Sequence, residues 1–280
     1  MLKNDIHDPV WFFDLEWVPD AAGAMRLYDL PPETTELEAM EKLWRGMPGF
    51  SDENPRPFVK YVFSRVVSIS FLSRRIAFRE GERHVEFGLH SLPKLPLEDG
   101  TPDEGQIIAQ FLHYVGVRKP QLVGFNSMDA DLQVLIQRGL VNEVRAEVFS
   151  ERPGKPWEGR DYFDRNGEAH LDLIKRFSNG AMCPRLNDIA RLCGFPGKID
   201  IDGAQVADLW LAGKLKEIVE YNQIDTLNTY LVWLRVVNFA GKISEEEYVA
   251  EQDDFRVYLE TEAAKEENDH IRRFLAKWEI

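Results

Sequence analysis

The chain has 280 residues, of which 44% are hydrophobic and 11% aromatic, so it can bury a sizeable core and fits one large domain better than two. Its formal net charge of −14 argues against a protein that binds long stretches of nucleic acid through phosphate contacts, so any polyanionic partner must be held locally. The two cysteines, Cys183 and Cys193, match neither a disulfide framework nor a paired zinc pattern, which favours a reducing compartment. Since there is no signal-peptide pattern and no apolar run of about 20 residues, we expect a cytoplasmic protein without a membrane span.

The first predicted element is a strand over residues 9–18, which is apolar on both faces, as in a central strand of a covered sheet. Residues 19–57 look like an insertion, because prolines and glycines surround one short amphipathic helix capped by Thr34 or Thr35. The expected apolar face of this helix consists of Leu37, Met40, Leu43 and Trp44. After the insertion, we predict strands at 61–75, 83–90 and 121–126, with a helix at about 102–114.

Beyond Asn126 the pattern is mainly helical, with helical spacing around 132–136, at 184–194 and at 206–239, the last interrupted near Gly213. From Ser244, the capping-box pattern "SEEE" opens a charged helical tail. We therefore predict one domain over residues 1–241 and a C-terminal extension over residues 242–280. Strands first and then helices with further strands indicate an α/β architecture, with a central mixed sheet flanked by helices.

Two acids interrupt the apolar run "WFFDLEW" at residues 11–17. Because residues two apart in a strand share a face, Asp14 and Glu16 point the same way and their carboxylates can converge on one point. No other Asp-x-Glu occurs in the chain, although it has 48 acidic residues. A solvated acidic face of an edge strand is the alternative, and this motif alone does not decide between the two.

A second acidic motif is "VGFNSMDADLQVL", in which a predicted strand ends at Asn126 and a helix follows a tight turn. Acids in the first turn of a helix are favoured by the helix dipole. Asp129 is well placed as an N-cap, a structural role that needs no catalysis. Asp131 has less structural reason to be there, and it lies at the end of the sheet where ligands of open α/β sheets bind.

The third motif, "EYNQIDTLNTYLVWLR", places Tyr221 and Asp225 four residues apart on a strongly apolar helix. This spacing puts both side chains on one face, about one turn from each other. Taken alone, the pair is better explained as a satisfied structural pair than as a site.

Together, the three motifs resemble those of the 3′-5′ exonucleases of the DEDD superfamily, whose ribonuclease-H-like fold carries four metal-binding acids. "FDLE", "NSMDAD" and "YNQID" resemble, in order, the three exonuclease motifs of family B DNA polymerases, the last in its tyrosine variant. The second motif selects Asp131 over Asp129, because Asp131 stands five residues after Asn126. Ala130 departs from this pattern, which usually has an aromatic residue there.

A closer resemblance is to a stand-alone bacterial family described as a predicted 3′-5′ exonuclease related to the polymerase B exonuclease domain. It covers roughly residues 9–236, and "SRVVSISF", "LVGFN", "RLNDIARLCGFPGK" and "LNTYLVWLR" occur in the order typical of that family. Trp17 is a departure, since the family often has threonine after the glutamate of the first motif.

The resemblance implies a set of metal ligands: Asp14, Glu16, Asp131 and Asp225. These would bind two divalent cations, Mg²⁺ or Mn²⁺, both of which prefer oxygen ligands. Tyr221 would orient the attacking water, since a phenol with a pKa near about 10 is a poor general base at neutral pH. Candidate contacts to the terminal nucleotide are Leu15, Phe125 and Asn126, although structural roles remain equally open for Leu15 and Phe125. His170 and Asp172 could also be ligands, but we expect them to be structural, because the four-acid set is complete without them.

The implied function is metal-dependent hydrolysis of phosphodiester bonds from the 3′ end of nucleic acid, releasing nucleoside 5′-monophosphates. DNA is favoured over RNA as the partner, and single-stranded ends are favoured. One alternative is a catalytically silent module that uses the same fold to bind nucleic acid or a protein. Another is an exoribonuclease with the same mechanism, because no residue in the sequence settles whether a ribose 2′-hydroxyl is recognised.

Overall fold

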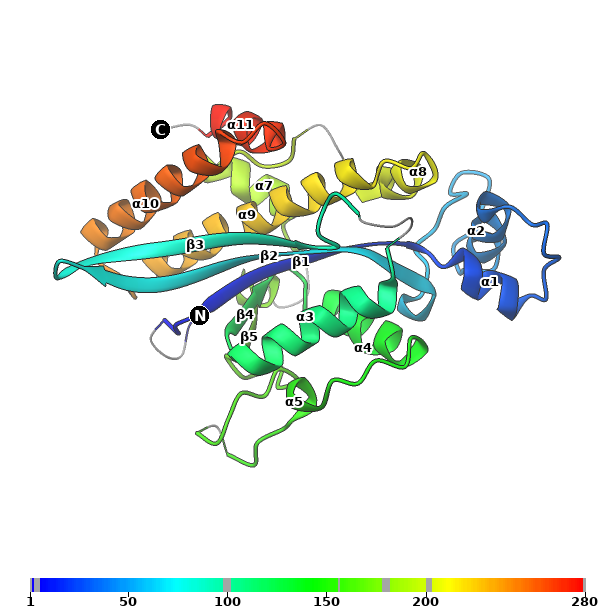
Figure 1. The fold of residues 1–280 in the computed structure, drawn as a ribbon, viewed down its shortest axis with the longest axis horizontal. Helices are drawn as coiled ribbons and strands as arrows, with labels where there is room; N and C mark the ends of the chain where they lie inside the picture. The colour runs from blue at the N-terminus through cyan, green and yellow to red at the C-terminus, as the bar shows by residue number, and fades with distance from the viewer. Residues whose placement is uncertain are drawn as a thin grey trace.

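The computed structural model describes residues 2, 6–97, 102–155, 157–177, 182–199 and 203–278. At the centre of this part of the chain lies a five-stranded sheet in the order β3-β2-β1-β4-β5 (Figure 1). The strands are β1 (Val10–Pro19), β2 (Ser64–Arg79), β3 (Glu82–Leu92), β4 (Gln121–Gly124) and β5 (His170–Asp172). Since β1 pairs antiparallel with β2 and parallel with β4, the sheet is mixed. Together with the flanking helices, it gives the expected α/β class and is consistent with a ribonuclease-H-like fold.

The helices that surround the sheet are α1 (Ala21–Leu27), α2 (Glu36–Arg45), α3 (Glu104–Arg118), α4 (Asp131–Val141), α5 (Glu147–Ser150), α6 (Ile174–Phe177), α7 (Leu186–Leu192), α8 (Val206–Leu211), α9 (Leu215–Phe239), α10 (Glu245–Ala263) and α11 (Asp269–Ala276). Short 3₁₀ turns occur at η1 (Tyr61–Phe63) and η2 (Gly203–Gln205). The predicted interruption near Gly213 is confirmed: this glycine has a φ of 71° and separates α8 from α9. The predicted capping box is also confirmed, with Ser244 as the N-cap of α10.

The central position of β1 follows from its two apolar faces. Val10 and Phe12 are buried in a core cluster with residues of α9, whereas Trp11, Phe13 and Leu15 are buried with residues of α3 and α4. The long helix α9 thus covers one face of the sheet, and α3 and α4 cover the other (Figure 1). Burying each large apolar side chain stabilises the fold by roughly 1.5–3 kcal/mol, which fixes the register of β1.

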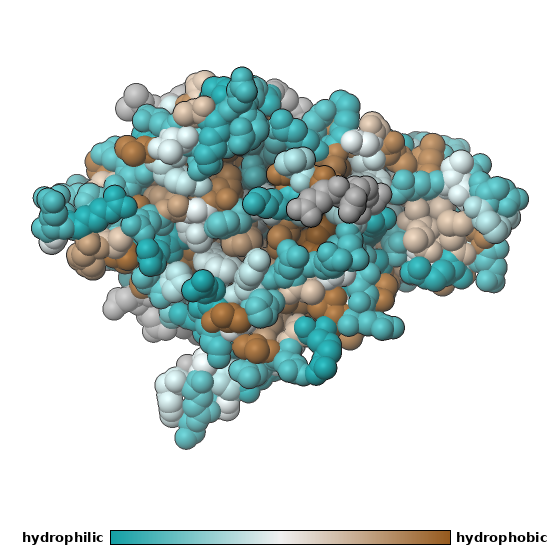
Figure 2. Space-filling view, in the orientation of Figure 1, coloured by the Kyte–Doolittle hydropathy of each residue, from teal (hydrophilic) through white to brown (hydrophobic). Residues whose placement is uncertain are grey.

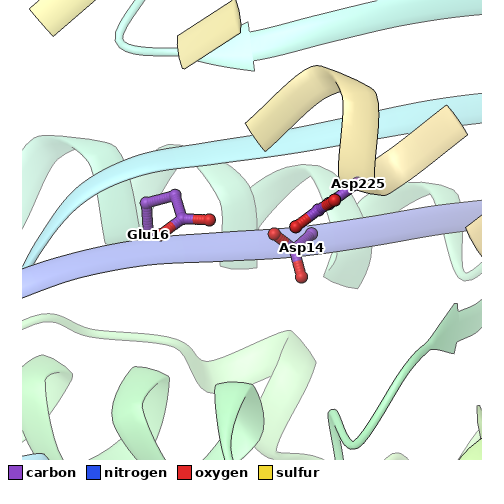
Figure 3. A group of neighbouring side chains, drawn as sticks. All are labelled: Asp14, Glu16 and Asp225. Carbon is purple, nitrogen blue, oxygen red and sulfur yellow. The ribbon is translucent and has the colours of Figure 1, made fainter. Parts of the chain in front are cut away.

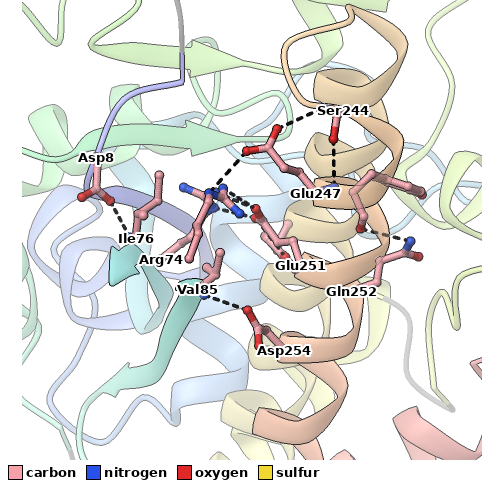
Figure 4. A network of polar contacts seen from close by, with 12 residues as sticks. Asp8, Arg74, Ile76, Val85, Ser244, Glu247, Glu251, Gln252 and Asp254 are labelled. Atoms are coloured by element: carbon pink, nitrogen blue, oxygen red, sulfur yellow. Dashed lines mark hydrogen bonds and ion pairs between the residues drawn. The ribbon is translucent and has the colours of Figure 1, made fainter. Parts of the chain in front are cut away.

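The C-terminal helices share the core of the sheet. Phe255 of α10 and Phe274 of α11 are fully buried in the cluster that contains Phe12. Arg74 of β2 donates two hydrogen bonds of 2.6 Å to the carboxylate of Glu251 on α10, and both side chains are fully buried (Figure 4). Breaking such a pair on one side leaves an uncompensated buried charge, which costs about 3–5 kcal/mol.

Helix α10 also covers the edge strand β3. The backbone N–H of Val85 donates to Asp254 at 2.8 Å (Figure 4), and that of Leu89 donates to the hydroxyl of Tyr258 at 2.6 Å. These side chains occupy backbone donors that an exposed edge would offer to another chain. Helices α10 and α11 therefore stabilise the sheet.

Residues 19–57, which the sequence predicts to be an insertion, contain α1 and α2. Thr35 caps α2 with a complete capping box, and Met40, Leu43 and Trp44 are buried as predicted. The prediction for Leu37 is wrong, because its side chain is 40% exposed. The buried side chains of α1 and α2 share a core cluster with residues of α8 and the start of α9, including Tyr221.

The molecular surface is mostly hydrophilic on the face shown in Figure 2, where hydrophobic side chains form small groups between larger polar areas. This distribution agrees with the net charge of −14. None of the helices in the described ranges has the length and apolar character needed to cross a membrane.

Candidate active site

The first two acids lie where β1 extends past its parallel neighbour. β4 pairs with β1 only from Val10 to Phe12, so beyond this point that edge of β1 has no paired strand in the described part of the chain. The alternation of side chains places Asp14 and Glu16 on the face covered by α9. It places Leu15 on the opposite face, where this side chain is only 3% exposed.

Asp225 of α9 completes a group of three acids. Asp14, Glu16 and Asp225 each offer a carboxylate oxygen, and these oxygens lie within 4.8 Å of one another. Figure 3 shows Asp225 reaching from its helix toward Asp14, with Glu16 farther along the same strand. The helical spacing of α9 and the strand spacing of β1 thus bring together acids from opposite ends of the sequence.

Asp131 lies beside this group at the start of α4. The backbone N–H of Leu15, between the two acids of β1, donates a 3.1 Å hydrogen bond to Oδ1 of Asp131. This bond occupies a backbone donor that a paired strand would otherwise use. Asp131 is 4% exposed, so its carboxylate is held at the edge of β1 and is shielded from water.

The turn before α4 is held by Asp172 of β5. Its carboxylate accepts the backbone N–H groups of Asn126 at 2.8 Å and Met128 at 3.1 Å, while His170 Nε2 bonds the Ser127 hydroxyl at 2.8 Å. Asn126 has a φ of 64°, a left-handed conformation that asparagine tolerates better than most residues. These contacts give His170 and Asp172 the structural role that the sequence predicted.

The interpretation of Asp129 as an N-cap is wrong. The N-cap residue of α4 is Ala130, which makes no side-chain capping bond. Asp129 instead pairs with Arg165 at 2.7 Å and with Lys175. Hydrogen bonding to Lys175 is the largest cause that lowers the pKa of Asp129, so this acid remains a charged surface group.

Three of the four candidate ligands have a pKa above the ordinary range of acids. Burial is the largest cause that raises the pKa of Asp14 and of Glu16 well above the usual range, and the charges of Asp131 and Asp225 raise both further. Burial also raises the pKa of Asp131 to about 7, although the N–H of Leu15 favours its charged form. Protons or cations must therefore neutralise this group near neutral pH.

The donor set fits a hard divalent cation. All candidate ligands are carboxylates, which are the side chains that Mg²⁺ and Mn²⁺ prefer. Oxygens that share one such ion at about 2.1 Å lie no more than about 4.2 Å apart, and the observed oxygens of Asp14, Glu16 and Asp225 are close to this limit. A cation bound by these oxygens would offset the repulsion between the carboxylates.

Asn222 contacts the acids but was not predicted as a site residue from the sequence. It is fully buried, and its side-chain amide donates a 2.7 Å hydrogen bond to Oδ2 of Asp14. Its carbonyl oxygen accepts a 2.9 Å hydrogen bond from Ser68 of β2. Asn222 lies inside the "YNQID" motif, but the motif pattern alone does not show that its side chain reaches β1.

Tyr221 lies at the edge of the acids with a lysine beside its hydroxyl. Lys198 Nζ donates a 2.9 Å hydrogen bond to Tyr221 Oη. Burial, followed by the charges of Asp225, Glu16 and Asp14, raises the pKa of Tyr221 far above its usual range. The phenol therefore keeps its proton at neutral pH.

A cleft of about 510 Å³ opens onto Asp14 and Asp225. Its other lining residues are Phe125, Arg185, Leu186, Asn187, Asp188 and Lys198. Phe125 thus lines the cleft, and Asn126 is exposed at the adjoining turn, so the substrate contacts predicted for both residues stay predictions. Leu15 is not brought to the cleft, because the alternation that directs both acids to one face directs Leu15 to the other.

The sequence motifs also did not predict the two cations that line the cleft, Arg185 and Lys198. Arg185 and Lys198 both come from the segment "PRLNDIARLCGFPGK". The Gly197 backbone that precedes the lysine is held by Asn228 of α9 through two hydrogen bonds of 3.0 Å. No local sequence pattern predicts this arrangement, because it depends on how the segment folds back onto α9.

Comparison with known proteins adds one finding. A family model described as "Predicted 3'-5' exonuclease related to the exonuclease domain of PolB" matches residues 56–278, more than half of the chain. The matched range includes Asp131, Tyr221 and Asp225, and it begins after the strand that carries Asp14 and Glu16. No curated protein matches the chain significantly.

Proposed function

Since the chain belongs to the family of predicted 3′-5′ exonucleases related to the exonuclease domain of PolB, we propose that it hydrolyses phosphodiester bonds from the 3′ end of nucleic acid. The observation that carries this proposal is the convergence of Asp14, Glu16 and Asp225, with Asp131 bonded to the strand between the first two. We propose single-stranded DNA as the favoured substrate, because the related domain belongs to PolB.

The acids would act as ligands. Two Mg²⁺ or Mn²⁺ ions bound by Asp14, Glu16, Asp131 and Asp225 would supply an activated water and stabilise the charge on the leaving oxygen. The raised pKa values of Asp14 and Glu16 support this role, since a group that resists ionisation on its own is stabilised by a cation.

Tyr221 would orient the attacking water. Because its phenol keeps its proton, it can position a water by hydrogen bonding but cannot serve as the base. Lys198, which bonds the same hydroxyl, would fix the orientation of the phenol and place a positive charge beside the reacting phosphate.

The cleft would hold the terminal nucleotide. Phe125 offers an aromatic face to a base or sugar, and the cleft contains the cations Arg185 and Lys198 on an otherwise acidic protein. A cleft of this size, in which two cations lie beside Asp188 and the candidate metal ligands, suits a chain end better than a long duplex.

The test uses 5′-labelled single-stranded DNA and RNA of one sequence, incubated with the protein in Mg²⁺ or Mn²⁺. We expect a ladder that shortens from the 3′ end, faster on DNA, and an arrest by a 3′-terminal phosphorothioate. Asp14→Asn should abolish the ladder while the protein stays folded.

The outcomes separate the alternatives. Faster degradation of RNA would indicate an exoribonuclease with the same site. The proposal would be contradicted if wild type and Asp14→Asn both bound the DNA and the RNA oligonucleotide without shortening either. That result would indicate a catalytically silent binding module.

A further inference from the structure

Three aromatic side chains form a continuous stripe beside the acids. We define this aromatic stripe as Trp17, Tyr61 and Phe58. The ring of Tyr61 meets that of Trp17 nearly at right angles with centroids 6.3 Å apart, and it meets that of Phe58 in the same way at 5.4 Å. Trp17 and Tyr61 are partly buried against the core, whereas Phe58 is 63% exposed. Edge-to-face contacts fix the exposed ring and leave its face accessible.

The aromatic stripe adjoins the proposed active site next to Glu16 and Asp131. Trp17 directly follows Glu16, and η1, which contains Tyr61, packs against α4, the helix that begins with Asp131. Burial raises the pKa of Tyr61, and the charges of Asp131 and Asp129 raise it further, as expected if its hydroxyl lies near them. The cleft is lined by residues of β1, α7 and α9 and of the segments that follow β4 and α7, and the three rings of the aromatic stripe are not among these lining residues.

The segment that contributes Phe58 and Tyr61 to the aromatic stripe also carries cations. Residues 56–65, "RPFVKYVFSR", carry Arg56, Lys60 and Arg65 and no acid, in a chain whose net charge is −14. Arg56 forms an ion pair with Asp208 at 2.7 Å, and the Arg65 guanidinium lies over the ring of Trp210 with 5.0 Å to its centroid. Lys60 is exposed between Phe58 and Tyr61 in the sequence. Aromatic rings interleaved with cations are the usual means by which proteins hold single-stranded nucleic acid.

We propose that the aromatic stripe is a subsite for nucleobases. A base upstream of the 3′-terminal nucleotide stacks on the exposed face of Phe58, while Tyr61 and Trp17 hold that ring in place. The choice of nucleic acid as the ligand rests on the proposed function. Stacking does not depend on base identity, so the subsite would serve an enzyme that removes successive nucleotides of any sequence.

The test measures binding, so that it does not depend on catalysis. Fluorescein-labelled (dT)12 is titrated with the Asp14→Asn protein in Mg²⁺ and followed by fluorescence anisotropy. Adding Phe58→Ala should weaken binding by about 5- to 100-fold, the range expected when stacking of one base is lost. Phe58→Trp should retain the affinity, because it keeps an aromatic face.

A matched control is Phe78→Ala. Phe78 is 73% exposed and lies eight residues along β2 from Ser70, the strand partner of Asp14, which corresponds to roughly 26 Å at the rise of an extended strand. This substitution should leave the affinity unchanged. A second control is a 12-mer of abasic residues, on which Phe58→Ala should have no effect because no base is present to stack.

Either of two results would overturn the subsite. One is a (dT)12 affinity that Phe58→Ala leaves unchanged; the other is a loss of affinity on Phe58→Ala that is equally large for (dT)12 and for the abasic 12-mer. The proposed function is decided separately by the wild-type ladder. If the wild type forms no ladder but Phe58→Ala weakens (dT)12 binding, the subsite is supported and the nuclease assignment is contradicted. If the wild type forms a ladder but Phe58→Ala leaves (dT)12 affinity unchanged, the nuclease assignment is supported and the subsite is contradicted.

Discussion

The side-chain amide of Asn222 donates a 2.7 Å hydrogen bond to Oδ2 of Asp14, joining α9 to β1 at the acids. This bond leaves the other oxygen of Asp14 available to the shared acidic site. Because Ser68 donates to the Asn222 carbonyl at 2.9 Å, the orientation of the amide is set by a neighbour in β2. Partners of this kind fix the direction of a metal ligand.

Asn222→Ala should therefore weaken Mn²⁺ binding by about 10- to 100-fold, the usual effect of removing a partner of a metal ligand. Isothermal titration with Mn²⁺ measures this change. Ser68→Ala leaves the bond to Asp14 in place and should have a smaller effect. An Asn222→Ala protein that binds Mn²⁺ as tightly as wild type would show that the hydrogen bond does not position Asp14 for the metal.

Asp172→Asn should loosen the turn that leads to Asp131. The carboxylate of Asp172 bonds the N–H groups of Asn126 and Met128 through different oxygens, and an amide can accept on only one side. We expect a loss of about 1–3 kcal/mol in the free energy of unfolding, measured by denaturant titration, and a lower rate of hydrolysis.

The matched control for Asp172 is Asp129→Asn, in the same turn. Asp129 pairs with Arg165 and Lys175 at the surface, where such pairs contribute about 0–1 kcal/mol. If the two substitutions had equal effects, the turn would not depend on Asp172.

Lys198→Met should lower kcat by about 100- to 1000-fold with a smaller change in KM, because an aligned positive charge acts mainly on charge that develops in the transition state. Steady-state hydrolysis of labelled (dT)12 measures both constants. Lys216→Met is the control, since this lysine lies on α9 with its side chain 63% exposed. A change confined to KM would assign Lys198 to substrate binding alone.

The metal-free protein should lose stability as pH rises, through Asp131. Its folded-state pKa is about 7, above its ordinary value of 3.8, so the protonated acid stabilises the fold below about pH 4 and this contribution is lost as pH rises through 7. Relative to Asp131→Asn, wild type in EDTA should lose on the order of a few kcal/mol of unfolding free energy between pH 4 and pH 8.

Asp129→Asn supplies a control of opposite sign for this pH series. Ion pairing lowers the pKa of Asp129, so its contribution is present at neutral pH and lost in acid. Denaturant titrations at each pH give the differences. A wild type whose stability relative to Asp131→Asn does not change with pH would contradict the raised pKa.

Regular spacing made much of the site predictable from the sequence. Alternation along β1 is sufficient to direct Asp14 and Glu16 to one face, and the four-residue spacing places Tyr221 and Asp225 on one side of α9. Both inferences depend only on local geometry. The apolar residues around these acids reinforce the same pattern.

Contacts between distant segments account for what the sequence did not reveal. The three residues of β5 are too few to show a period, although Asp172 at its end holds the turn before α4. The role of Asp129 depends on Arg165 and Lys175, and the burial of Arg74 depends on Glu251 in α10. None of these pairings leaves a local signal.

The most direct test of the metal site is a crystal structure with Mn²⁺ and thymidine 5′-monophosphate, using the anomalous signal of manganese. The proposal predicts two peaks roughly 3.5–4 Å apart, both within bonding distance of Asp14 and surrounded by Glu16, Asp131 and Asp225, with the phosphate facing Tyr221. Manganese bound elsewhere, or an Asp225 side chain turned away from Asp14 when the ions are bound, would contradict it.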